Sequence, residues 1–149
     1  MHPLKSRPVS LDEIVRYTRF YSVDLINDQP VSIPAVFSSY FLLRINYTEW
    51  TQAFLDNLSV ELAKRGVRVT PDSKNKIRGK LSDFNTGKDY EIDGLQITVT
   101  LTSPVSRWSK RYEESGYSYG SRNDAIKKVM KLNTEKIMKD VEFFHEIQN

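Results

Sequence analysis

Apolar residues recur at helical spacing in two long stretches of the chain. Asn46 and Glu49 have the arrangement of a helix capping box, and an apolar stripe follows them at intervals of four: Trp50, Phe54, Leu58 and Leu62. A second stripe begins after about Arg122 and contains Ile126, Val129, Met130, Asn133, Ile137 and Val141. Each stripe predicts a long amphipathic helix that buries one face against a core.

Alternation of apolar and polar residues marks the strands. The clearest strand runs from Leu95 to Thr102, where Leu95, Ile97, Val99 and Leu101 share one face and polar residues share the other. Further strands are predicted at 19–26, near 40–44, and at 67–70, 76–84 and 106–119, with a short helical turn at 11–17. We therefore expect an α+β two-layer sandwich, in which two long helices pack on one face of a mainly antiparallel sheet.

The length and composition agree with one globular domain. A chain of 149 residues, with 39% hydrophobic and 28% charged residues, is long enough to bury a core without disulfides or a structural metal. We expect a single domain over residues 1–149, with 1–18 and 142–149 as peripheral tails. No run of about 18 apolar residues occurs, so no membrane-spanning helix is predicted.

The inventory of reactive side chains is short. There is no cysteine, and the two histidines, His2 and His145, lie near the ends of the chain. Thiolate metal sites and a cysteine nucleophile are therefore excluded, and a histidine-based triad or zinc site is disfavoured. We expect a protein that is not an enzyme and holds no metal and no cofactor.

Two groups of residues could be taken for a binding or catalytic site, namely the glycines at 116 and 120 and the acidic residues at 83–93. We interpret both groups as structural. Gly116 and Gly120 lack the spacing of a phosphate-binding loop, so we interpret Gly116 as a bend or bulge in a strand and Ser121 as the cap of the last helix. The acidic residues Asp83, Asp89, Glu91 and Asp93 flank a predicted hairpin. We interpret them as solvated turn residues rather than a catalytic pair or a calcium loop.

A basic cluster is the main candidate for a binding surface. Between residues 64 and 80, seven cations are opposed by Asp72 alone: Lys64, Arg65, Arg68, Lys74, Lys76, Arg78 and Lys80. The candidate partner-binding residues are Arg68, Lys76, Arg78 and Lys80, with Tyr112 and Tyr117 as aromatic anchors; Trp108 lies on the same predicted strand. The same cations could also simply line the solvated face of a strand.

Three segments of the chain resemble the small bacterial envelope lipoproteins of the YajG type. They read EWTQAFLDNLSVELAKRGVRVTPDSKNKIRGKLSDF, LQITVTLTS and RYEESGYSYGSRNDAIKKVMKLNTEKIMKDV, and the similarity covers residues 47–142. It is a similarity of layout, shared also with the lipopolysaccharide-assembly lipoproteins. It implies a periplasmic domain held at the outer membrane by a lipidated cysteine, and it carries over no catalytic residues. This chain has neither the leader nor that cysteine.

These observations lead to two main alternative functions, and an enzyme that works with carboxylates alone is ranked third, below both. The first is a non-catalytic interaction module of the cell envelope, the mature domain of a lipoprotein, which binds a protein or an anionic glycolipid. It is expected in the periplasm if a leader has been removed, and it would contact the membrane only through a lipid anchor absent from this chain. The second, ranked below it, is a cytoplasmic domain that binds RNA or single-stranded DNA through the basic stripe 64–80, in which case the chain is complete.

Overall fold

A computed structural model describes residues 21–29, 35–36, 44–86, 93–118 and 122–148; of 35–36, 44–45, 83–86, 93–94, 117–118 and residue 122 it describes the backbone alone. The predicted helical turn at 11–17 lies outside these residues. Most of the predicted strand near 40–44 does too, although β3 (Arg44–Ile45) pairs with β2 (Ala35–Val36) in a small antiparallel sheet.

The main sheet has five strands in the order β4-β1-β5-β6-β7. Its members are β1 (Ser22–Asn27), β4 (Arg68–Val69), β5 (Lys76–Thr86), β6 (Asp93–Thr102) and β7 (Ser109–Ser118). The long pairings β5 to β6 and β6 to β7 are antiparallel, whereas β1 runs parallel to both of its neighbours. The parallel pairs arise because the chain leaves β1 and crosses the sheet in a helix before it returns.

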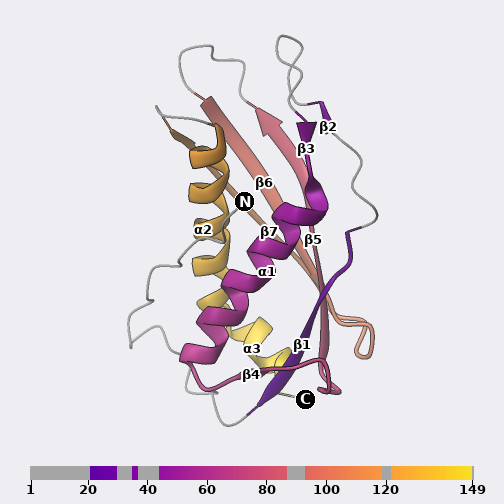
Figure 1. Cartoon of the computed structure of the whole chain (residues 1–149). Coiled ribbons are helices and arrows are strands. Elements are labelled where there is room, and N and C mark those ends of the chain that lie inside the picture. Colours follow the sequence, from indigo (N-terminus) through magenta and orange to yellow (C-terminus); the bar gives the residue numbers. More distant parts are fainter. Residues whose placement is uncertain (1–20, 30–34, 37–43, 87–92, 119–121, 149) are drawn as a thin grey trace.

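In the described residues, three helices accompany the sheet: α1 (Tyr47–Lys64), α2 (Arg122–Met138) and α3 (Val141–Ile147). Figure 1 shows α1 and α2 on one face of the sheet, with α3 at the end of α2, near β1 and β4. The fold is therefore the predicted α+β arrangement of a helical layer on a mixed sheet. The Asn46 side chain caps α1 and accepts the Glu49 N–H at 3.1 Å, as the capping-box pattern predicts.

The core lies between the two layers. It is formed by the predicted stripes of both long helices and by the apolar face of β6, where Ile97, Val99 and Leu101 are fully buried. Gly79 of β5 lies directly under α1, since a Cβ atom there would come within 2.9 Å of Leu55 Cδ2. Glycine at this position lets the helix approach the strand closely.

The last helical segment differs from the prediction. The apolar stripe predicts one helix through Val141, but α2 ends at Met138, and Asp140 caps a separate helix, α3. Val141 is consequently exposed, while Phe143, Phe144 and Ile147 are buried. The expectation that 142–149 is a peripheral tail is therefore wrong for the residues of α3, because the break before Asp140 turns their aromatic side chains into the core.

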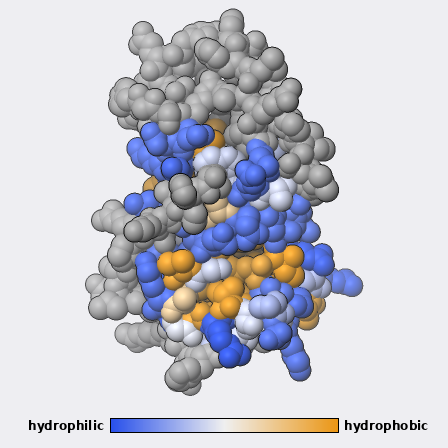
Figure 2. Space-filling model, viewed as in Figure 1, coloured by the Kyte–Doolittle hydropathy of each residue, from blue (hydrophilic) through white to orange (hydrophobic). Residues whose placement is uncertain are grey.

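The side of the molecule that carries the helices is not uniformly polar. Figure 2 shows hydrophobic side chains gathered over the lower half of this face, where α1 and α3 lie next to β1, with hydrophilic residues around them. Val60 of α1 keeps 49% of its surface exposed. Within the described part of the chain, no helix is both long and apolar enough to cross a bilayer.

Candidate functional site

The strand register separates the basic residues from the helices. Gly79 faces Leu55 of α1, so the odd-numbered residues at the start of β5 point toward the helical layer. Lys76, Arg78 and Lys80 alternate with them and therefore project from the opposite face of the sheet. Arg78 and Lys80 are exposed, and Lys76 is half-buried.

Neighbouring strands add two more cations to this face. Arg68 of β4 precedes Val69, which packs against the core, so Arg68 points away from the helices. On β7, Arg111 lies next to Thr100 of β6, and Thr100 lies next to Lys80. We call the surface formed by Arg68, Lys76, Arg78, Lys80 and Arg111 the cationic face.

The charges of the cationic face are only partly balanced. Lys76 Nζ lies 2.9 Å from Asp24 Oδ2, and Arg111 Nη2 lies 3.2 Å from Glu113 Oε1. Arg68, Arg78 and Lys80 make no ion pair within the described part of the chain. Thr98, farther along the same face, is fully buried, so the exposed cationic area lies at the Lys76 end of β5.

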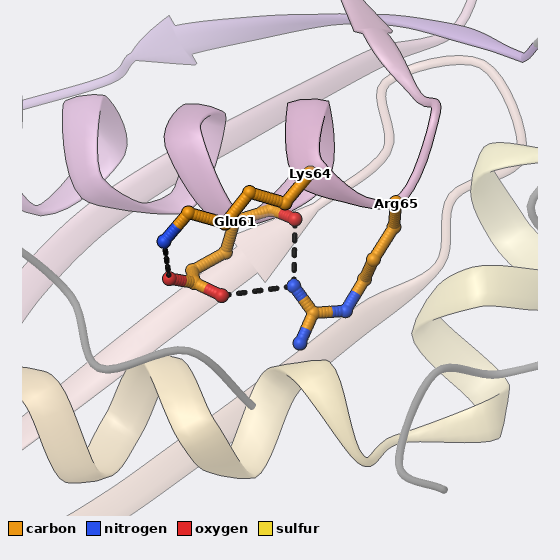
Figure 3. Close-up of polar contacts among 3 residues, drawn as sticks. All are labelled: Glu61, Lys64 and Arg65. Carbon is orange, nitrogen blue, oxygen red and sulfur yellow. Dashed lines mark hydrogen bonds and ion pairs between the residues drawn. The ribbon is translucent and has the colours of Figure 1, made fainter. Parts of the chain in front are cut away.

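Two cations of the predicted basic stripe belong elsewhere. Arg65 is 5% exposed, and its Nη1 donates to Glu61 Oε2 at 2.9 Å and to the Glu61 carbonyl at 2.6 Å. Lys64 Nζ donates to the other carboxylate oxygen of Glu61 at 3.1 Å (Figure 3). The stripe 64–80 is therefore not one continuous surface, because its first two members close the C-terminal end of α1.

Glu61 is a residue that the sequence analysis overlooked. Its side chain is almost completely buried, and it is the carboxylate that neutralises the start of the basic stripe. The signal was present in the spacing, since Glu61 and Arg65 lie four residues apart on a helix and such residues are neighbours. The Arg65 Nε and Nη2 atoms are buried and have no hydrogen-bond partner within the described structure.

Tyr112 is not a surface anchor, and the prediction that it contacts a partner is wrong. It pairs with Val99, on the helix-covered face, and only 2% of its surface is exposed. Its hydroxyl donates to Asp140 Oδ2 at 2.6 Å, and Lys110 Nζ donates to the same oxygen atom of Asp140 at 2.8 Å. Glu142 also accepts from Lys110, at 2.7 Å.

This network joins β7 to the junction between α2 and α3, and it shifts the pKa of three groups. Burial, reinforced by the hydrogen bond to Asp140, raises the pKa of Tyr112 far above its ordinary value. Burial acts to raise the pKa of Asp140, but hydrogen bonds from Lys110, Tyr112 and the Glu142 amide outweigh it and leave that pKa below the ordinary value. Hydrogen bonds to Asp140 and Glu142 raise the pKa of Lys110. The network is structural, because all three groups are engaged with one another.

The other aromatic candidates offer no described stacking surface. The side chain of Tyr117 lies outside the described structure, although its backbone pairs with Gly94 in the sheet. Trp108 is half-buried and packs against Phe143, with their ring centroids 6.4 Å apart.

Gly116 has a packing role rather than a bending one. The register between β6 and β7 runs without interruption through the pair Leu95 and Gly116, so the predicted bulge is absent there. A Cβ atom at Gly116 would lie 3.3 Å from Val129 Cγ2, and glycine thus lets α2 approach β7. The register shift of this sheet lies instead in β5, between Ser82 and Asn85. The predicted cap Ser121 lies outside the described residues.

The acidic residues of the predicted hairpin are Asp83, Asp89, Glu91 and Asp93, and their side chains lie outside the described structure. Among the side chains that are described, no three carboxylates or histidines gather at a spacing that could hold a metal ion.

Comparisons with known proteins show the fold but not a family. No family model matches the chain, and no curated protein matches it. The structure is similar to that of protein XCC0632 from Xanthomonas campestris, of the family model DUF330, with a TM-score of 0.50 and 11% identity over 88% of this chain and 86% of that one. This likeness shows that the two proteins share a fold.

Two further solved structures resemble the chain more loosely. The PelC dodecamer from Paraburkholderia phytofirmans gives a TM-score of 0.39 and 10% identity over 80% of this chain and 86% of that one. A protein from Helicobacter pylori, described as a homolog of the neuraminyllactose-binding hemagglutinin, gives 0.41 and 14% over 97% and 91%.

Proposed function

We propose that this chain is a non-catalytic interaction module of the bacterial cell envelope, which binds an anionic partner through the cationic face. The observation that carries the proposal is the pair Arg78 and Lys80. Both are exposed on one face of β5, and neither has an anionic partner in the described part of the chain. The proposal assigns no residue a catalytic role.

The spacing of these cations favours a partner that carries several negative groups. Alternate residues on a strand lie about 6.5 to 7 Å apart, and neighbouring strands lie about 4.8 Å apart. A single exposed ion pair contributes only about 0 to 1 kcal/mol, so useful affinity needs several contacts made together. The phosphates of an anionic glycolipid surface, or an acidic protein surface, meet this requirement.

The envelope setting is supported by the layout of the chain. Residues 47–142 resemble YajG-type envelope lipoproteins in the order of a helix, a strand meander and a terminal helix. The described structure has this order from α1 to α2. In the proposal the domain is periplasmic, and its cationic face is directed at the envelope component that it binds.

The test is retention of the protein on vesicles that contain lipopolysaccharide, compared with vesicles of zwitterionic lipid alone. The variant R68Q/K76Q/R78Q/K80Q is expected to lose most of its retention, and retention of the native protein is expected to fall steeply as salt is added. A control variant, K127Q/K131Q, removes two positive charges from α2 in the other layer, and its retention on the vesicles is expected to change little.

Three outcomes decide between the candidate partners. Equal retention of the native chain and the quadruple variant would reject the cationic face as the binding surface. Capture of an acidic envelope protein, lost in the same variant, would retain the face and identify a protein as the partner. Tight binding of single-stranded RNA without retention on vesicles would favour the nucleic-acid alternative, with a salt dependence that reports the number of phosphates contacted.

A further inference from the structure

The outer edge of β7 carries a self-complementary charge pattern. The sheet order leaves β7 as the last strand of the described sheet, with ten residues. It contains the run Lys110, Arg111, Tyr112, Glu113 and Glu114, so two cations and two carboxylates are placed symmetrically about a tyrosine. When the strand direction is reversed about Tyr112, each cation therefore lies opposite a carboxylate.

The backbone of β7 shows which residues can pair across this edge. The Trp108 carbonyl accepts the Ser103 N–H at 2.8 Å, so even-numbered residues direct their backbone groups toward β6, because the direction alternates along an antiparallel strand. The Glu113 carbonyl accepts instead from Lys136 Nζ of α2, at 3.1 Å, and therefore points away from β6. Odd-numbered residues such as Arg111, Glu113 and Ser115 thus present their backbone groups at the outer edge.

We propose that β7 pairs antiparallel with β7 of a second copy of this chain, about a two-fold axis through Tyr112. In this register Arg111 lies opposite Glu113 of the second copy, and Glu113 lies opposite its Arg111. Both residues have outward-pointing backbone groups. The ladder forms if the Glu113 carbonyl exchanges its exposed hydrogen bond from Lys136 Nζ for one from the Arg111 N–H of the second copy. On the helix-covered face, Lys110 lies opposite Glu114 of the second copy.

Charge selects this register over its neighbours. A shift to the next two-fold register in either direction places Arg111 opposite Arg111 or Glu113 opposite Glu113, and like charges directly opposite each other are destabilising. An odd shift brings inward-pointing backbone groups opposite outward-pointing ones and breaks the ladder. The side chains of Arg111 and Glu113 are 60% and 49% exposed, so the ion pair that they form within one copy can be exchanged for pairs between copies.

The resulting dimer has a definite geometry. The two-fold axis is normal to the sheet, so the two sheets join into one and both helical layers stay on the same side. Such an interface uses the same surface on both copies and closes after two. Both cationic faces then point in one direction, although the pairing itself does not depend on what these faces bind.

Charge reversal tests the pairing, with sedimentation velocity over a range of protein concentrations as the measurement. The variants R111E and E113R each place like charges at two sites of the dimer, and the dissociation constant is expected to rise at least about tenfold in each. An equimolar mixture of R111E and E113R places unlike charges at both sites, so a heterodimer is expected. The double variant R111E/E113R is expected to recover the homodimer.

A variant that alters the backbone tests the pairing independently of charge. Ser115→Pro removes an outward N–H without changing charge, and proline is tolerated on the solvent side of an edge strand. It is expected to be monomeric with a native circular dichroism spectrum. A native chain that stays monomeric at its highest soluble concentration would overturn the proposal. So would folded R111E and E113R variants that dimerise as the native chain does, or whose mixture stays monomeric.

Discussion

Glu61 and Arg65 show how burial changes the role of a charged residue. In the sequence Arg65 belongs to a run of cations, but in the structure its side chain is 2% exposed and that of Glu61 is 1% exposed. A buried charge is tolerated only when it is paired, so each of these residues depends on the other. Glu61 has a second cationic partner in Lys64, whose side chain keeps 45% of its surface in solvent.

Glu61 has two cationic partners, whereas Arg65 depends on Glu61, so mutations of the two residues should have unequal effects. In E61Q, Arg65 remains buried without a carboxylate, and we expect a loss of about 3 to 5 kcal/mol in the free energy of unfolding. In R65M, Lys64 still neutralises Glu61, and the loss should be smaller. Urea unfolding followed by circular dichroism measures both. The paired variant E61L/R65M should lose less than E61Q alone; an R65M variant less stable than E61Q would contradict this account.

The network of Tyr112, Asp140 and Lys110 predicts how stability depends on pH. The pKa of Asp140 is lower in the folded protein than its ordinary 3.8. Its contribution to the free energy of unfolding is therefore present above pH 3.8 and is lost as the pH falls through the folded pKa. The pKa of Tyr112 is raised from 10.0, so its contribution is present below pH 10 and is lost only at higher pH. Between these limits the network should contribute a constant amount.

The measurement is the free energy of unfolding from pH 2.5 to 6 for the native chain and for D140N. The native chain should lose stability through this network as the pH falls below 4, whereas D140N should be less stable at pH 6 and lose less on acidification. Y112F provides the matching variant for the alkaline side, because it removes the phenolic proton. Parallel acid curves for the native chain and D140N would show that Asp140 does not contribute in this way.

At the scale of elements, α3 differs most from the prediction, because the sequence analysis expects a peripheral tail and the structure has a helix that packs into the core. Phe143 and Phe144 pack edge to face, with their ring centroids 5.5 Å apart, and Asn75 Nδ2 donates to the Ile147 carbonyl at 3.0 Å. The helix therefore links the end of the chain to the turn before β5. Its seven residues close the core at one end of the sheet.

We expect F144A to lower the free energy of unfolding by about 3 to 5 kcal/mol, the usual cost of removing a buried phenyl ring. V141A is the matched control, since Val141 lies on the same helix with 53% of its surface exposed, and it should change stability little. Thermal and urea unfolding of the two variants provide the comparison. Equal stability of both would mean that α3 does not belong to the core.

At the scale of the whole molecule, the cationic face and the edge of β7 are neighbouring surfaces of one sheet, and they share Arg111. The first lies on the face opposite the helices, and the second lies along the last strand. If both proposals hold, pairing through β7 doubles the number of cations that face one partner, and two linked sites bind more strongly than one.

The two surfaces should be separable by mutation. The quadruple variant R68Q/K76Q/R78Q/K80Q is expected to lose retention on vesicles that contain lipopolysaccharide but to remain a dimer. S115P is expected to become a monomer with its charge unchanged, and its retention should fall several-fold. Sedimentation and vesicle retention, measured on the same samples, show whether the two properties are independent. Full retention by a monomeric S115P would show that binding needs only one copy.

Much of the candidate site could be predicted from the sequence, and the failures have identifiable causes. The alternation at 76–84 was enough to place Lys76, Arg78 and Lys80 on one face of a strand. The strand 106–119 has polar or aromatic residues on both faces, so the pattern does not show which face is buried, and the prediction of an exposed Tyr112 is wrong. Nothing local indicated that β1 lies between β4 and β5, which is what brings Arg68 to the same face.

The sequence by itself determined the elements: the two long helices, the strands of the meander and the face that each helix buries. These depend on periodicity and capping, which involve residues only a few positions apart. Only the tertiary structure decided the order of the strands, the burial of Glu61 with Arg65, the side taken by Tyr112 and the docking of α3. Each of these depends on contacts between residues far apart in the chain; the four-residue spacing of Glu61 and Arg65 predicts that they are neighbours on a helix, but not that the pair is buried.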